Sequence, residues 1–258
     1  LCTQTQRDHI KAIIHGSVKL TNIQTCCGAF DFNLGCSGFV YGLSISKALV
    51  NDGTANNILL LMSETYTKHV HPYDKSTRTI FSDGAAAILV KNDIGKDKIG
   101  KFVFGTDGKG VNKLIVSAGG MKMPKTNENT ATYVDRFGNK RSLDKLYMNG
   151  TEVLKFTLEK VPLLVKDILA RNSLELDQID MFIFHQASLC VLKSLRDKLG
   201  IPEEKFYINL KNIGNTVCAS IPIALKQAEK EGWIKRKDKV MIVGYGVGFS
   251  WGGTVIEY

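Results

Sequence analysis

Hydrophobic and polar positions recur along this chain with two different periods, which predicts a protein built from both strands and helices. Apolar residues recur near helical spacing over residues 37–50, and the sequence NDG at 51–53 is a typical helix end. Residues 57–62 form a continuous apolar run, which is typical of a strand covered on both faces. Residues 29–33 predict a short buried strand ahead of the first helix.

The middle of the chain predicts paired strands followed by a less regular connection. Residues 79–81 and 85–90 are apolar and flank the turn sequence SDG, so we expect them to pair with each other. Residues 91–140 are richer in Gly, Lys and Asn and are less periodic. This composition indicates a connecting or inserted region with short strands such as 114–116.

Helical and strand patterns return after residue 150. A helical pattern covers residues 151–170, and Pro162 inside it predicts a kink or a division into two helices. Residues 181–184 predict another buried strand. The remaining predicted elements are helices over 189–199 and 220–231 and strands over 239–243 and 254–258.

A strand that leads into a polar elbow and then a helix is predicted twice. The first elbow lies in FNLGC at 32–36 and the second in FHQA at 184–187. This internal similarity indicates two duplicated α/β halves. Both elbows would then lie at the carboxyl ends of their strands, where α/β proteins place their sites.

Composition narrows the class of protein. The chain has 258 residues, of which 44% are hydrophobic and 23% charged, as in an ordinary soluble globular protein. Its apolar runs are shorter than the roughly 20 residues that a membrane span needs, and no signal peptide pattern is present. The chain opens on Leu1 rather than Met, from which we expect a truncated start.

The net charge of +9 predicts an anionic partner. No basic block, zinc-finger spacing or aromatic RNA-binding motif is present, which argues against nucleic acid. The remaining partners are phosphate-bearing small molecules or an acidic protein, although any single lysine is more commonly part of a solvated surface.

Six cysteines in a chain of this length do not predict a disulfide scaffold. No C-x-x-C pair occurs, so no zinc site or other metal site is expected. We expect free thiols in a reducing, cytosolic compartment, with five of them inert and buried and one reactive. The six are Cys2, Cys26, Cys27, Cys36, Cys190 and Cys218.

Cys36 is the candidate nucleophile. It lies in GCSG at 35–38, between a predicted strand and a predicted helix. The helix N-terminus would lower the pKa of the thiol, and the flanking glycines permit a sharp turn and close approach of a substrate carbonyl. Taken alone, the local sequence fits a buried structural cysteine at least as well.

Two further residues gain interest together with Cys36. His185 follows a short apolar strand and can donate a proton or a hydrogen bond in a closed site. Asn215, in GNT at 214–216, is by itself most simply a turn residue. Cysteine, histidine and an amide can, however, share one acyl-transfer site. The predicted loop residues His69 and His71 are better explained as surface groups than as metal ligands.

The glycine-rich sequence GYGVGFSWG at 244–252 follows a predicted strand. It lacks the third glycine of a dinucleotide fingerprint and no helix follows it, so a nicotinamide or flavin fold is disfavoured. Its backbone N–H groups can instead stabilise an oxyanion. The simpler alternative is a tight connection between two closing strands.

Four motifs in this order resemble the β-ketoacyl-acyl-carrier-protein synthase III family. They are DFNLGCSGF at 31–39, HQA at 185–187, GNT with ASIP over 214–222, and the final glycine-rich segment. The resemblance covers residues 28–258 and implies a thiolase-like α/β fold: two pseudo-repeated halves in a layered αβαβα arrangement, with the first unit missing. It divides the chain into an incomplete N-terminal half (1–92), a connecting region (93–150) and a C-terminal half (151–258).

The resemblance also implies a mechanism and a set of roles. Cys36 would take an acyl group from acyl-CoA, and a malonyl carrier protein would then lose carbon dioxide and attack that group. His185 and Asn215 would bind the malonyl thioester oxygen. The backbone N–H groups of Cys36 and Val247 would form the oxyanion hole. The residues implied near the acyl group are Phe81, Gly246, Gly248 and Phe249.

Binding residues and partners follow from the same resemblance. Lys75 matches a position where relatives often carry Arg near the CoA nucleotide. Relatives also carry Arg five residues after the catalytic histidine for carrier-protein docking; Cys190 stands there, and Lys193 and Arg196 can supply the charge. The implied partners are acyl-CoA, an acidic acyl carrier protein and a second copy of the chain in a cytoplasmic homodimer. No cofactor is implied besides these thioester substrates.

The chain departs from the family in residues 6–20, where relatives are more apolar and shape the acyl pocket across a dimer. Lys11, His15 and Lys19 interrupt this segment. Two alternatives stay open: an acyltransferase on the same fold that acts on a hydroxyl or amine without decarboxylation, and an inactive or truncated partner subunit. The pairing of His with Asn disfavours two-histidine elongating enzymes. The absence of Gly-Pro-Gly in the last loop disfavours plant-type polyketide synthases.

Overall fold

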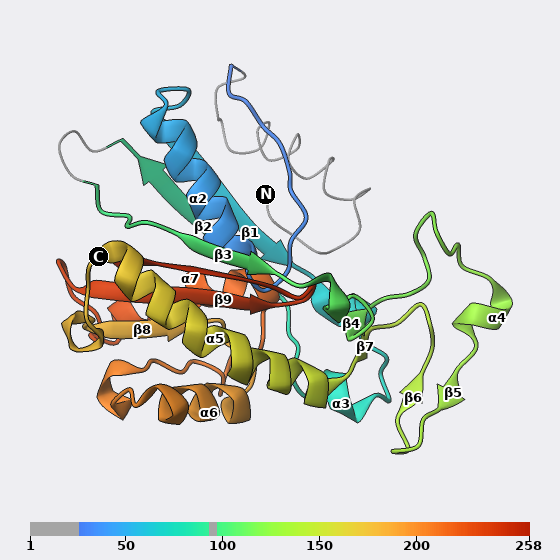
Figure 1. The fold of residues 1–258 in the computed structure, drawn as a ribbon. Helices are drawn as coiled ribbons and strands as arrows, with labels where there is room; N and C mark the ends of the chain where they lie inside the picture. The colour runs from blue at the N-terminus through green and yellow to red at the C-terminus, as the bar shows by residue number, and fades with distance from the viewer. Residues whose placement is uncertain (1–25, 93–96) are drawn as a thin grey trace.

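The computed structural model describes residues 26–92 and 97–258, in which two main sheets have helices between and beside them (Figure 1). The smaller sheet pairs β1 (Asn57–Glu64) with β2 (Gly84–Lys91) in antiparallel register. The larger sheet has the order β3-β10-β9-β8, in which only the pairing of β8 with β9 is parallel. Its strands are β3 (Val103–Thr106), β8 (Met181–Phe184), β9 (Lys239–Gly246) and β10 (Ser250–Glu257).

Four long helices cover these sheets, and shorter elements connect them. The long helices are α2 (Gly38–Asn51), α5 (Gly150–Asn172), α6 (Leu189–Leu199) and α7 (Ser220–Lys230). The short helices are α3 (Lys75–Arg78), α4 (Asn127–Thr130) and the 3-10 turns η1 (Tyr66–His69), η2 (Gly108–Gly110), η3 (Leu176–Gln178), η4 (Glu203–Lys205) and η5 (Val217–Ala219). Two small strand pairs are β4 (Leu114–Ile115) with β7 (Tyr147–Met148) and β5 (Tyr133–Val134) with β6 (Lys140–Arg141).

Strand β8 is apolar at every position because both of its faces are covered. Met181 and Ile183 belong to a core that also contains residues of α2, α7 and β1. Phe182 and Phe184 point the other way, into a core built with α5 and α6. The described residues therefore form four layers in the order sheet, helices, sheet, helices, which confirms the layered α/β arrangement.

Two predicted strands are wrong. Residues 29–33 form no buried strand, and Phe30 is 57% exposed, because three apolar residues interrupted by Asp31 and Asn33 bury too little surface to hold a strand inside. Residues 79–81 do not pair with 85–90. Phe81 instead forms a parallel bridge with Asn215, and β2 takes all eight of its partners from β1.

Two other expectations need correction in part. Strand β1 is buried on one face only, since Leu59 is 46% exposed, whereas a continuous apolar run predicted burial on both faces. Pro162 lies inside the single helix α5 and does not divide it. By contrast, α6 has the predicted bounds, and α2 and α7 match within a residue.

Candidate active site

Cys36 lies in a tight turn immediately before α2. The turn is closed by the Gly38 N–H, which donates to the Gly35 carbonyl at 2.7 Å, and Ser37 occupies the N-cap position. The thiol is only 5% exposed and is part of an apolar cluster with Tyr66 and Phe81. The positive end of the α2 helix dipole lies at this position, which favours thiolate over thiol.

Two glycines let strand β9 pass directly against this turn. A Cβ added at Gly244 would lie 2.8 Å from the Ser37 Cα, and one added at Gly246 would lie 2.7 Å from the Cys36 Sγ. Both contacts are closer than side-chain carbons tolerate, so only glycine fits at either position. The sequence GYG therefore brings the end of β9 into van der Waals contact with Cys36.

Gly246→Ala is expected to slow acylation of Cys36 at least tenfold, because the new methyl group displaces the sulfur from its position at the helix N-terminus. The time course of the mass increase on mixing with acyl-CoA measures this. Gly108→Ala is the matched control, since an added Cβ there meets nothing within 4 Å. Equal acylation rates in both variants would show that the close contact has no role.

His185 follows the last residue of β8 and is 1% exposed. Its N–H donates to the Val243 carbonyl at 2.8 Å, which continues the parallel pairing with β9 past the end of the strand. Its ring Nδ1 lies 2.7 Å from the Ser220 Oγ. Burial lowers the pKa of His185 to about 3, against a smaller raising effect of a hydrogen bond with the Val217 backbone. The imidazole is therefore neutral at physiological pH.

The next residue, Gln186, fixes the elbow after His185. Its buried side chain donates to the Phe184 carbonyl at 2.7 Å, and its Oε1 accepts from the Asn209 N–H at 2.7 Å. The segment after η4 is thereby attached to the end of β8. The motif HQA therefore contains His185, the candidate site residue, and Gln186, whose side chain holds the backbone around it.

Asn215 is held from both sides by the residues that precede β2. Its N–H donates to the Ile80 carbonyl at 3.0 Å, and its carbonyl accepts from the Ser82 N–H at 2.9 Å. Gly214 precedes it with a positive φ of 73°, the left-handed conformation that favours glycine. The backbone of the GNT motif is therefore pinned beside Phe81.

The side-chain amide of Asn215 has a defined orientation. Its Oδ1 accepts from the Val217 N–H at 2.9 Å, and its Nδ2 donates to the Ala187 carbonyl at 3.3 Å. Because Oδ1 is occupied by a backbone donor, the amide nitrogen is the end that lies next to the His185 elbow. An amide nitrogen carries two N–H groups, so it can donate to a ligand as well as to Ala187.

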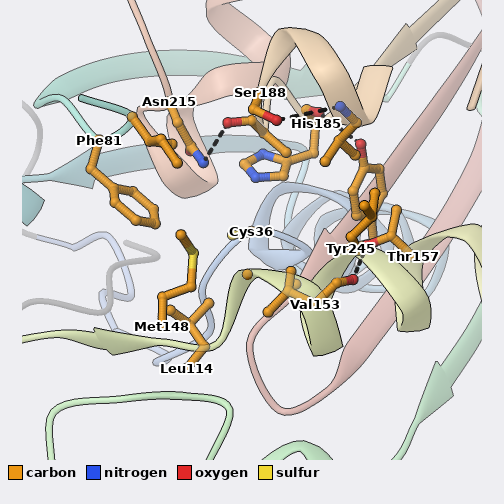
Figure 2. Close-up of a pocket in the computed structure, with 16 residues that line it drawn as sticks. Cys36, Phe81, Leu114, Met148, Val153, Thr157, His185, Ser188, Asn215 and Tyr245 are labelled. Atoms are coloured by element: carbon orange, nitrogen blue, oxygen red, sulfur yellow. Dashed lines mark hydrogen bonds between the residues drawn. The ribbon is translucent and has the colours of Figure 1, made fainter. Parts of the chain in front are cut away.

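Cys36, His185 and Asn215 meet in one cavity of about 120 Å³ (Figure 2). They come from three segments far apart in the sequence, and the figure shows their side chains arranged around a common space with Phe81 and Met148. Most of the lining is apolar. Its aliphatic members are Ile80, Leu114, Met148, Val153, Leu154, Ala187 and Val191.

The structure brings some of the other predicted site residues here and places others elsewhere. Phe81 and Gly246 line the cavity. Val247 packs against the cluster that contains Cys36, and its carbonyl accepts from the Ser250 hydroxyl at 2.9 Å. Phe249 does not line the cavity as expected, because its ring stacks on Phe156 with centroids 4.1 Å apart. Gly248 is likewise not a lining residue.

Sequence reasoning missed several lining residues. Met148, Thr157 and Tyr245 line the cavity, and Tyr245 donates its hydroxyl to the His185 carbonyl at 3.2 Å. The first two lie in the connecting region and in α5, where no motif marks them. Tyr245 lies inside the glycine-rich motif, and its position between Gly244 and Gly246 was the available signal.

The predicted binding cations differ in their surroundings. Lys75 lines a second groove, of about 470 Å³, together with Arg78 and Lys140. Lys193 is exposed on α6. Arg196 forms ion pairs with Asp197 and Glu203, so its charge is partly neutralised. These pairs make Arg196 a weaker candidate for docking than the sequence suggested.

Cysteine burial corrects another expectation. Of the cysteines in the described part of the chain, Cys26, Cys27 and Cys190 are exposed, whereas five of the six were expected to be inert and buried.

Residues 6–20, on which acyl specificity was expected to depend, lie outside the described residues. No helix in the described ranges is both long and apolar enough to cross a membrane. Within the same ranges no group of His, Cys, Asp or Glu side chains is arranged to hold a metal ion.

Comparison with known proteins connects this geometry to one family. A model of 3-oxoacyl-[acyl-carrier-protein] synthase III matches residues 30–108, and a model of the C-terminal part of the same enzyme matches residues 169–258. The β-ketoacyl-[acyl-carrier-protein] synthase III of Caldanaerobacter subterraneus is 36% identical over 231 residues, which cover 89% of this chain and 67% of that protein. The Natranaerobius thermophilus enzyme of the same name is 37% identical over 243 residues, which cover 93% and 70%.

Solved structures agree with the sequence comparison. A crystal structure of 3-oxoacyl-[acyl-carrier-protein] synthase III superposes with a TM-score of 0.97 at 43% identity, covering 100% of this chain and 77% of that one. The chain therefore belongs to the β-ketoacyl-[acyl-carrier-protein] synthase III family and has its thiolase-like fold.

Proposed function

We propose that this chain is a condensing enzyme of the transferase class that initiates fatty acid synthesis. It would join an acyl group from acyl-CoA to malonyl-[acyl-carrier-protein], with loss of carbon dioxide, to give a 3-oxoacyl-[acyl-carrier-protein]. The observation that carries this proposal is the meeting of Cys36, His185 and Asn215 in one apolar cavity. The family of the chain supports the same reaction.

The first half-reaction is acylation of Cys36. The sulfur attacks the thioester carbonyl, a C–S bond forms, and CoA leaves as its thiol with the proton that Cys36 gives up. The helix dipole of α2 stabilises the attacking thiolate. The N–H groups of Cys36 and Val247 hold the negative oxygen of the tetrahedral intermediate. Close contact between β9 and the turn at Cys36 brings these two backbone segments together.

The second half-reaction is decarboxylation followed by carbon–carbon bond formation. His185 and the Asn215 Nδ2 donate hydrogen bonds to the malonyl thioester oxygen. As the bond to the carboxylate breaks, its electron pair forms an enolate whose charge those donors stabilise. The enolate carbon attacks the acyl carbonyl, and the Cys36 thiolate leaves.

The low polarity of the site suits this step. Because the pKa of His185 is lowered to about 3, the ring acts as a neutral donor and not as a cation that would bind the malonyl carboxylate and oppose its loss. The apolar lining also disfavours the charged carboxylate relative to neutral carbon dioxide. The proposed chemistry requires no cofactor besides the two thioester substrates.

Cationic residues outside the cavity suit the anionic parts of both substrates. Lys75, Arg78 and Lys140 line one groove and can bind the phosphates of CoA. Lys193, exposed on the helix that follows the His185 elbow, can contact an acidic carrier protein. We further propose that the enzyme acts in the cytoplasm as a homodimer, as the resemblance to its family implies.

The test of this function uses the full chain with acetyl-CoA, longer acyl-CoA thioesters and malonyl-[acyl-carrier-protein]. We expect a mass increase on Cys36 with acyl-CoA alone, and stoichiometric carbon dioxide and 3-oxoacyl-carrier protein once the second substrate is added. Acylation without carbon dioxide release, but with transfer to a hydroxyl or amine, would indicate the acyltransferase alternative. No acylation with any thioester would overturn both.

A further inference from the structure

Ser220, the first residue of α7, is in direct contact with the His185 ring although the two are 35 positions apart. Its hydroxyl lies 2.7 Å from Nδ1, and both side chains are almost completely buried. The same hydroxyl accepts the Gln186 N–H at 3.3 Å. Ser220 therefore binds the ring and the backbone of the elbow that carries it.

This contact determines which edge of the imidazole is left for substrate. The two ring nitrogens lie on opposite sides of the five-membered ring. Nδ1 is engaged by Ser220, which does not line the cavity, whereas His185 itself does. Since Nδ1 is occupied by the Ser220 hydroxyl, Nε2 is the nitrogen left for the malonyl thioester oxygen, and His185 and Asn215 line the same cavity.

Ser220 is well placed to keep the ring still. It opens α7, and this helix packs against β2, β8 and η5, so the hydroxyl is attached to the centre of the molecule. Tyr245 also contacts the ring in a T-shaped arrangement, with centroids 5.6 Å apart. The hydrogen bond from Ser220 and the contact with Tyr245 together restrict rotation of the imidazole within the cavity wall.

We propose that Ser220 is a positioning residue for the decarboxylation half-reaction, holding the His185 imidazole at Nδ1 so that Nε2 meets the malonyl thioester oxygen. This inference rests on the proposed function of the site. It assigns no contact between Ser220 and substrate. It predicts that losing the hydroxyl harms decarboxylation and spares acylation, since acylation depends on the turn at Cys36 and the N-terminus of α2.

The test compares Ser220→Ala with Ser220→Thr, which keeps a hydroxyl, and with Ser46→Ala. Ser46 is a matched control because it is a buried serine on a helix outside the cavity. In Ser220→Ala we expect carbon dioxide release from malonyl-[acyl-carrier-protein] to fall about 10- to 100-fold. The rate of Cys36 acylation should stay within about threefold. Ser220→Thr should recover at least part of the loss, and Ser46→Ala should leave both rates unchanged.

A second measurement does not depend on turnover. In protein labelled with ¹⁵N-histidine, the Nδ1 resonance of His185 should shift in Ser220→Ala and stay in place in Ser46→Ala, because a hydrogen bond at that nitrogen is lost in the first only. If the wild-type chain releases no carbon dioxide, the proposed function fails. If the wild-type chain is active and Ser220→Ala releases carbon dioxide at an equal rate, or loses both half-reactions equally, the role of Ser220 is overturned.

Discussion

Cys36→Ala is expected to abolish the acyl-enzyme and with it condensation from acyl-CoA, by at least about 1,000-fold. The substitution removes only the sulfur, which is the atom that forms the covalent bond, and it relaxes the close contact with Gly246. The fold should therefore persist. Intact mass after incubation with acyl-CoA, followed by peptide mapping, measures the adduct directly.

Cys190→Ala is the matched control for this experiment. Cys190 is an exposed thiol in the first turn of α6, so it shares the helix N-terminus but not the cavity. The Cys190→Ala variant should be acylated on Cys36 at the wild-type rate. An adduct of equal mass and rate in Cys36→Ala would show that a different nucleophile carries the acyl group and would contradict the assigned role.

Cys36→Ala should affect the release of carbon dioxide much less than it affects acylation. His185 and Asn215 receive their hydrogen bonds from segments other than the turn at Cys36. Slow decarboxylation of malonyl-[acyl-carrier-protein] without condensation is therefore expected to persist in Cys36→Ala. Persistent decarboxylation would show that His185 and Asn215 act in this step without the Cys36 thiol.

The sequence predicted the elements whose signals are local. Helix α6 begins after Ser188, a capping residue, and ends at Gly200 in the left-handed conformation, and both signals are visible in the sequence. Strand β8 is fully apolar because it is covered on both faces, and its short apolar run predicted that. Such elements can be predicted because they depend on residues close in the sequence and on burial, and the pattern of apolar positions indicates burial.

Pairing between distant segments could not be predicted in this way. The turn sequence at 82–84 suggested a hairpin, but β1 offers β2 a register of eight residue pairs, which outweighs a three-residue partner. Residues 79–81 run instead beside Asn215, where the Ile80 carbonyl and the Ser82 N–H anchor the GNT motif. This anchoring is part of the site, and no local pattern indicates it.

Some residues of the site could be predicted from local motifs, and others could not. Cys36, His185 and Asn215 were found because each lies in a short motif with a chemically distinctive residue. Ser220 was missed because a serine at the start of a helix is ordinary, and only the fold brings it to the His185 ring. The ion pair of Arg196 with Glu203 was missed for the same reason, since Glu203 lies beyond the end of its helix.

Asn215→Asp is expected to reduce decarboxylation by about 100- to 1,000-fold at neutral pH while acylation stays within about threefold. One carboxylate oxygen can still accept the Val217 N–H, but the other replaces Nδ2 and faces the Ala187 carbonyl. The site loses a donor to the developing enolate and gains a negative charge beside it. Carbon dioxide release and intact mass measure the two half-reactions separately.

The Asn215→Asp variant should also acquire a pH dependence that arises from its new carboxyl group. Burial of the new carboxyl beside a carbonyl raises its pKa, and the protonated form carries an O–H that can donate where the amide did. Decarboxylation by Asn215→Asp should therefore recover as pH falls. Asn215→Ala, which has no titrating group, should stay equally slow over the same range, so a parallel recovery in both variants would contradict hydrogen-bond donation by Asn215.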